Sequence, residues 1–166
     1  HGVMAKLTLP GGVGNQDYYK EIMQLIKENE MKERIEFPGM VSQEELSALY
    51  RQADICFFSS HWQSGLSAVP MEAMACGCVV ITYGNENSRE IIEHNQTGFI
   101  VSEGDFDGAV SIIQRLVNDT NQYQAIIECA LNEIDLKYTM ERYVSEIEAF
   151  LCESLEKHQE KHNGNH

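Results

Sequence analysis

Residues 54–82, DICFFSSHWQSGLSAVPMEAMACGCVVIT, decide the fold of this chain. Apart from Asp54 and Thr82, the runs 54–58 and 78–82 are apolar, which is typical of strands that a parallel sheet buries on both sides. Between them, residues 67–75 have the composition of a helix, and Gly77 is placed to end it. A strand, a helix and a second strand in this order predict a crossover unit with parallel strands.

The same alternation continues on both sides of this unit. A capping box, Ser42 followed by Glu45, marks the start of one further helix. The spacing of apolar residues predicts other strands at 3–9, 34–37 and 99–101, and helices at 17–28, 88–93, 107–117, 121–136 and 140–157. We therefore predict an α/β fold: a single Rossmann-like domain in residues 1–157, with one parallel sheet of five or six strands and helices on both faces. A polar, disordered tail is expected at 158–166.

Composition excludes several classes of protein. The chain has 166 residues, 43% of them apolar, which suits one globular domain. No stretch of 18 or more residues lacks charge, so we predict no transmembrane segment. The 26 Asp and Glu outnumber the 12 Lys and Arg, and a net charge of −14 opposes nucleic acid as a partner. The five cysteines have no metal or redox spacing and favour a reducing, cytoplasmic location.

The segment between the two deciding strands also carries the candidate site. Gly65 precedes a helix at the expected carboxyl edge of the sheet, where backbone N–H groups and the positive helix end bind phosphates. Glu72 lies one to two turns into that helix, with apolar neighbours on both sides. A carboxylate in that position needs hydrogen-bond donors. Ribose hydroxyls and a backbone amide both satisfy this need, so the spacing alone leaves a nucleotide-binding role and a structural role open.

Residues 64–77, SGLSAVPMEAMACG, resemble the signature of the group-one retaining glycosyltransferases of the GT-B fold. That signature is a Glu, a Gly-rich turn, and a second Glu eight positions on, followed by Ala-Met-Ala-x-Gly. Residues 72–77 match its second half closely, and the stretches 37–54 and 79–101 resemble the preceding and following blocks of the family. The resemblance covers about residues 3–150 and implies the carboxyl-terminal, donor-binding half of a GT-B fold.

The resemblance implies a role for each matching position. Glu72 would bind the ribose hydroxyls of a nucleotide-diphosphate sugar, which is a substrate and not a cofactor, and no metal is implied. Backbone N–H groups of Gly65, Leu66 and Ser67 would bind the diphosphate or the sugar. The turn at residues 39–41 would lie against the base. The implied donor-binding residues are Glu72, Ser64, Gly65, Leu66, Ser67, Gly39, Met40 and Val41.

Two departures from the family pattern shape the expected function. The first Glu of the signature falls on Ser64, with Gln63 adjacent, and this places the donor-sugar contact in question. In the family, an Arg and a Lys neutralise the diphosphate. Both precede the strand that corresponds to the first strand of this sequence, so they are not among its residues. We therefore expect the donor domain of a larger enzyme of polysaccharide biosynthesis, inactive alone, whose catalytic residues lie in an amino-terminal acceptor domain. The enzyme would move a hexosyl group to a saccharide or lipid-linked acceptor at the cytoplasmic face of a membrane.

Alternatives remain at this stage. A GT-B-shaped nucleotide-sugar epimerase and a non-catalytic nucleotide-binding module share the same expected fold. The 12–14 segment, Gly-Val-Gly, is either a plain turn or a loop that supports the nucleotide site. His61, Trp62 and Tyr83 follow neighbouring strands and are either rim residues or the wall of a sugar pocket. If the helix at 140–157 packs on the expected acceptor domain, it should expose an apolar patch in this chain.

Overall fold

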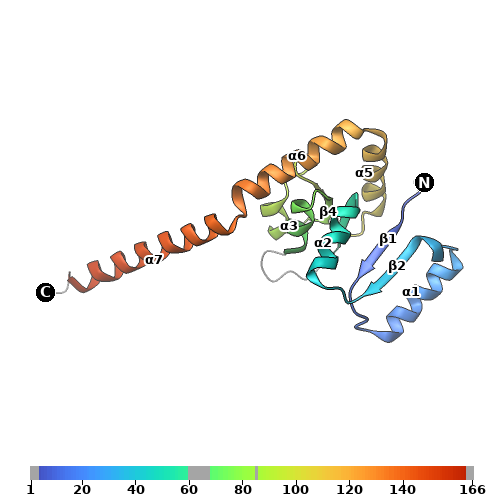
Figure 1. Cartoon of the computed structure of the whole chain (residues 1–166), viewed down its shortest axis with the longest axis horizontal. Helices are drawn as coiled ribbons and strands as arrows, with labels where there is room; N and C mark the ends of the chain where they lie inside the picture. Colours follow the sequence, from blue (N-terminus) through green and yellow to red (C-terminus); the bar gives the residue numbers. More distant parts are fainter. Residues whose placement is uncertain (1–3, 60–67, 85, 164–166) are drawn as a thin grey trace.

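The computed structural model describes residues 4–59, 68–84 and 86–163. Strands alternate with helices along this part of the chain, so the predicted α/β fold is confirmed (Figure 1). The strands are β1 (Leu7–Pro10), β2 (Ile35–Gly39), β3 (Ile55–Phe58), β4 (Val79–Tyr83) and β5 (Phe99–Val101). The helices are α1 (Gln16–Glu28), α2 (Gln43–Gln52), α3 (Ala68–Ala75), α4 (Glu86–Ile91), α5 (Phe106–Asn118), α6 (Thr120–Lys137) and α7 (Met140–Asn163), with a 3-10 turn at Lys32–Arg34.

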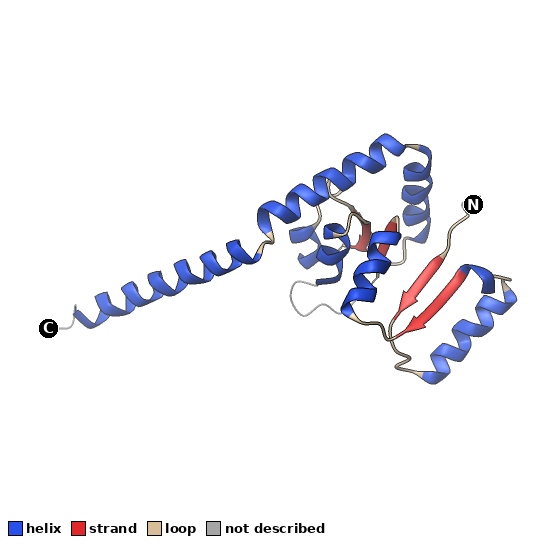
Figure 2. Ribbon diagram, in the orientation of Figure 1, coloured by secondary structure: helices blue, strands red, loops and turns tan. Residues whose placement is uncertain are grey.

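The strands form two sheets in the described part of the chain (Figure 2). β1 pairs with β2, and β3, β4 and β5 form a second sheet in that order, with every pairing parallel. The sequence predicts one continuous sheet of five or six strands, whereas the five described strands form two separate sheets. The apolar pattern identifies each strand locally, but no described strand joins β1 to β3, and that pairing is a long-range property that the pattern does not contain.

Helices cover both faces of the three-stranded sheet, as the continuous apolar runs predict. Side chains of β4 alternate between two buried clusters because successive strand residues point to opposite faces. Val79 and Ile81 pack with Leu116 of α5 and Ile126 of α6, whereas Val80 packs with residues of α3 and with the end of α4. All five residues of β4 are buried, so this strand is the centre of the core.

The two-stranded sheet is packed differently. The ring of Tyr19 on α1 meets that of Phe37 on β2 edge-to-face, with centroids 5.7 Å apart. Arg34 donates from Nε to the carbonyl of Ala5, at 3.0 Å, which holds the segment before β1 beside β2. In contrast to β4, every residue of β1 is exposed.

Helix α7 extends away from the other elements (Figure 1). The sequence predicts that it ends at residue 157, whereas it continues to Asn163, because residues 158–162 contain helix-favouring Gln, Glu and Lys and a Gly first appears at 164. The predicted exposure of an apolar patch on this helix is confirmed. Its exposed apolar side chains recur at helical spacing: Met140, Tyr143, Val144, Ile147, Phe150, Leu151 and Leu155.

None of the helices in the described ranges combines the length and the apolar character that a bilayer span requires.

Candidate functional site

The turn after β2 is built on a glycine. Gly39 has a φ of +77°, a conformation that side chains with a Cβ rarely adopt. Its carbonyl accepts a hydrogen bond from the backbone N–H of Gly11 at 2.8 Å, and a Cβ at Gly12 would lie 3.3 Å from Sδ of Met40. The loop after β1 therefore contacts the turn after β2. The Met40 side chain stays 82% exposed at the carboxyl edge of this sheet.

The first turn of α2 follows directly and joins this turn to α3. The predicted capping box is present: the Ser42 hydroxyl accepts from the N–H of Glu45 at 3.2 Å, and the Glu45 carboxylate accepts from the N–H of Ser42 at 2.7 Å. The hydrogen bond from the Ser42 backbone N–H, with that from the Ser42 side chain, lowers the pKa of Glu45. Gln43, the first residue of α2, donates from Nε2 to Oε1 of Glu72 at 3.4 Å. The structure thus brings Glu72 next to the helix that continues from residues 39–41.

Glu72 is half-buried on α3, beside the fully buried Ala73 and Met74. Among the described residues, Gln43 donates the one hydrogen bond that the Glu72 carboxylate accepts. The backbone amide that a purely structural role for Glu72 requires is therefore not found among them. Tyr50 of α2 packs against the cluster under α3, and burial, aided by nearby groups that include Glu72, raises the pKa of this tyrosine to about 12. With one hydrogen bond from the described residues, the Glu72 carboxylate keeps capacity to accept others.

The other half of the predicted site lies outside the described residues. The structure does not describe residues 60–67, which include the predicted site residues Ser64, Gly65, Leu66 and Ser67 and also His61, Trp62 and Gln63.

Tyr83 does not fit the alternative in which it forms the wall of a sugar pocket. It is 8% exposed, belongs to the core cluster with β5 and α5, and packs edge-to-face on Phe57 with ring centroids 5.8 Å apart. The odd positions of β4 all point to this covered face, so Tyr83 is a packing residue and not the wall of a pocket.

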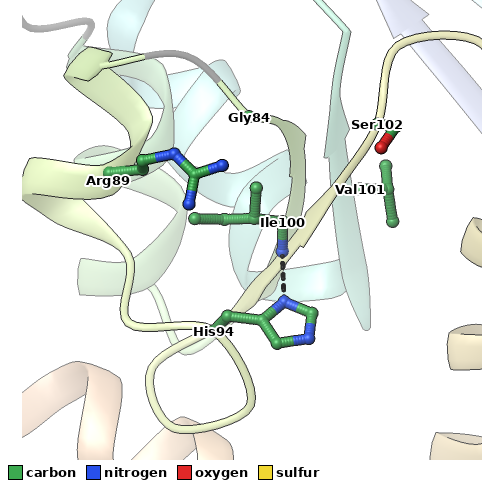
Figure 3. Close-up of a pocket in the computed structure, with 6 residues that line it drawn as sticks. All are labelled: Gly84, Arg89, His94, Ile100, Val101 and Ser102. Carbon is green, nitrogen blue, oxygen red and sulfur yellow. Dashed lines mark hydrogen bonds between the residues drawn. The ribbon is translucent and has the colours of Figure 1, made fainter.

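A separate pocket flanks β5, and the sequence did not predict it. It is lined by Gly84, Arg89, His94, Ile100, Val101 and Ser102 (Figure 3). Within it, Nδ1 of His94 accepts the backbone N–H of Ile100 at 3.0 Å (Figure 3). Of the predicted donor-binding residues that the structure describes, Gly39, Met40, Val41 and Glu72, none lines this pocket.

Comparison with known proteins identifies the family. The model of the family described as "Glycosyl transferases group 1" matches residues 5–133. This chain belongs to the group 1 glycosyl transferases. The match includes the turn at 39–41 and all of α3, so the resemblance seen in the sequence is confirmed.

The chain is also similar to individual proteins in sequence and in structure. The chain is 29% identical over 153 residues, 92% of its length, to N-acetyl-alpha-D-glucosaminyl L-malate synthase of Bacillus anthracis. Its structure is similar to that of Anabaena HepE, solved in complex with UDP-glucose, with a TM-score of 0.77 and 25% identity over 92% of this chain. Sucrose-phosphate synthase of Thermosynechococcus elongatus shares the fold, with a TM-score of 0.80 at 22% identity. The predicted carboxyl-terminal half of a GT-B fold is thus confirmed.

The chain spans about 40% of the length of these relatives: 39% of the malate synthase and 41% of HepE.

Two contributors to the site were missed in the sequence. Gln43 carries the contact to Glu72, and its signal was its place as the first helical residue after the Ser42 cap. Gly11 carries the contact to the turn after β2, but it stands next to Pro10 and fits an ordinary turn signal. Both contacts join residues about 30 positions apart, which is why local pattern did not reveal them.

Proposed function

We propose that this chain is the donor-binding part of a retaining glycosyltransferase that uses a nucleotide-diphosphate sugar. The Glu72 carboxylate binds the ribose hydroxyls, the turn formed by Gly39, Met40 and Val41 lies against the base, and backbone N–H groups of residues 64–67 bind the diphosphate. The observation that carries the proposal is the Gln43–Glu72 contact, which links the carboxylate to the helix that begins at this turn.

The chemistry of Glu72 supports the ribose in preference to the phosphates. An ionised carboxylate only accepts hydrogen bonds and has about four lone-pair sites, of which the described residues use one. Its ligand must therefore supply donors, as paired hydroxyls do, and cannot be another anion. In a chain with a net charge of −14, the diphosphate needs neutral backbone donors close by. The similarity to HepE, which binds UDP-glucose, supports a nucleotide sugar as the ligand class.

The proposal extends to the whole enzyme. Because the chain spans about 40% of its relatives' length, we assign acceptor binding and the catalytic residues to another part of the same protein. This chain alone therefore binds donor but does not transfer the hexosyl group. The acceptor is a saccharide or a lipid-linked saccharide, the enzyme acts in the cytoplasm, and the reaction retains the anomeric configuration.

The test is a titration that separates ribose recognition from folding. UDP and its 2′,3′-dideoxy analogue are titrated calorimetrically into the wild type, Glu72→Gln and the control Glu128→Gln, which changes an exposed glutamate on α6. Hydrogen bonds to a charged group contribute about 1.5–3 kcal/mol each, so Glu72→Gln should weaken UDP at least ~10-fold. The dideoxy analogue should bind both proteins equally weakly. An equal affinity of Glu72→Gln and the wild type for UDP would contradict the proposal.

A second test concerns the departure at Ser64. A serine hydroxyl carries no charge, so we propose that the donor sugar gains little here and that UDP binds about as tightly as UDP-glucose. Ser64→Glu should then favour UDP-glucose over UDP by about 1 kcal/mol, the contribution of one added hydrogen bond. A wild type that already prefers UDP-glucose, with no gain from Ser64→Glu, would show that a neighbour such as Gln63 makes the sugar contact.

A further inference from the structure

The pocket beside β5 brings three hydrogen-bonding side chains together. Its lining includes the guanidinium of Arg89, the imidazole of His94 and the hydroxyl of Ser102. These residues come from α4, from the segment between α4 and β5, and from the position directly after β5 (Figure 3). The cavity has a volume of about 340 Å³, which lies within the range of small-molecule sites.

Arg89 brings a positive charge to this pocket without an acidic partner. In the part of the chain that the structure describes, its guanidinium takes part in no ion pair and no hydrogen bond. The side chain extends from α4 toward Ile100 (Figure 3). Gly84 leaves room for it, because a Cβ there would lie 3.2 Å from Nη2 of Arg89 and 2.8 Å from Cγ2 of Ile100. The N–H donors of the guanidinium are therefore open to a ligand.

His94 offers a second donor because one hydrogen bond fixes its tautomer. Its Nδ1 accepts the backbone N–H of Ile100 at 3.0 Å, so the neutral ring carries its proton on Nε2. The ring also packs edge-to-face on Phe99, with centroids 6.0 Å apart, which holds its orientation. His94 thus supplies Nε2–H as a neutral hydrogen-bond donor.

The charge of the lining indicates the class of ligand. The planar guanidinium of an arginine matches the paired oxygens of a carboxylate or a phosphate. The described lining supplies one positive charge, from Arg89, whereas His94 and Ser102 add neutral donors. One positive charge balances a carboxylate. A phosphate dianion would keep excess negative charge in a chain whose net charge is already −14.

We propose that this pocket binds a small organic carboxylate. The guanidinium of Arg89 pairs with the carboxylate, His94 and Ser102 donate to oxygens of the ligand, and the carbon skeleton lies against Ile100. β5 is the last strand in the order β3-β4-β5, so the pocket lies two strands away from β3, which precedes the proposed diphosphate-binding residues. The inference does not depend on the proposed function.

Amide chemical shifts of the ¹⁵N-labelled chain test the proposal with glucuronate, glucose and inorganic phosphate at neutral pH. Glucuronate and glucose share a pyranose ring, but glucuronate has a carboxylate where glucose has a neutral hydroxymethyl group. Millimolar glucuronate should shift the amides of Ile100 and Ser102 along a saturating curve, and glucose should leave them unchanged. No shift with glucuronate, or equal shifts with glucose, would overturn the proposal. Tighter binding of phosphate than of glucuronate would also overturn it, because the site would then prefer a phosphate.

A matched pair of arginine variants locates the binding. Arg89→Gln removes the proposed partner of the carboxylate from the last turn of α4, and Arg51→Gln removes an exposed arginine from the last turn of α2. Arg89→Gln should weaken glucuronate binding at least ~10-fold, because hydrogen bonds between charged groups are the strong ones. Arg51→Gln should bind glucuronate as the wild type does, and both variants should keep the amide spectrum of the folded chain. Equal glucuronate affinities of Arg89→Gln and Arg51→Gln would refute the site.

Discussion

The capping box of α2 connects stability to the candidate site, and Ser42→Ala tests this connection. The variant removes the hydroxyl that accepts the N–H of Glu45 at 3.2 Å, at a helix start whose next residue contacts Glu72. Loss of an N-cap hydroxyl destabilises a protein by about 1 kcal/mol, within a range of roughly 0.5–2. For a chain of this size, that corresponds to a thermal midpoint about 2–4 °C lower. Ser47→Ala, in the same helix but away from its end, is the matched control and should have little effect.

The pH dependence of stability reports the other half of the capping box. The hydrogen bond from the Ser42 backbone N–H, with that from the Ser42 side chain, holds the pKa of Glu45 below its usual 4.5, so the carboxylate stabilises the folded state at neutral pH. This contribution is present above pH 4.5 and is lost as the pH falls through the lowered pKa. The difference in urea midpoint between the wild type and Glu45→Gln should therefore shrink in acid. The difference between the wild type and Ser42→Ala should change less with pH, because that variant keeps the Ser42 backbone N–H. A Glu45→Gln difference that stays constant with pH would refute the reasoning.

The remaining predictions concern the turn, the β5 edge and the cysteines. Gly39→Ala should destabilise the protein by about 1 kcal/mol in chemical denaturation, because only the positive φ, and no neighbouring atom, opposes a Cβ there. His94→Leu removes the acceptor of the Ile100 N–H, and that amide should exchange faster while stability falls by about 1 kcal/mol. Iodoacetamide at neutral pH should modify the exposed Cys129 well before Cys78, since burial raises the pKa of Cys78 to about 12; equal rates in mass spectrometry would contradict this.

Sequence alone identified the parts of this protein that depend on neighbours along the chain. The Ser42–Glu45 box spans one helical turn, and the apolar run of β4 indicates its burial directly, whereas the similar run of β3 is only partly buried. Residues 64–77, which contain Glu72 and the following Ala-Met-Ala-x-Gly, resemble the family signature, and the family match confirms this resemblance. Each of these signals lies within about ten residues of sequence, so the pattern was sufficient to detect it.

Only the tertiary structure decided how these parts meet. The contacts from Gln43 to Glu72 and from Gly11 to Gly39 each join positions about 30 residues apart, and helix packing and strand pairing create them. The direction of Tyr83 depends on which face of β4 is covered by α5 and α6, which the apolar run does not specify because both faces are buried. The separation into two sheets has the same cause. An apolar run indicates that a strand is buried, but the elements that fold against the strand select the strand with which it pairs.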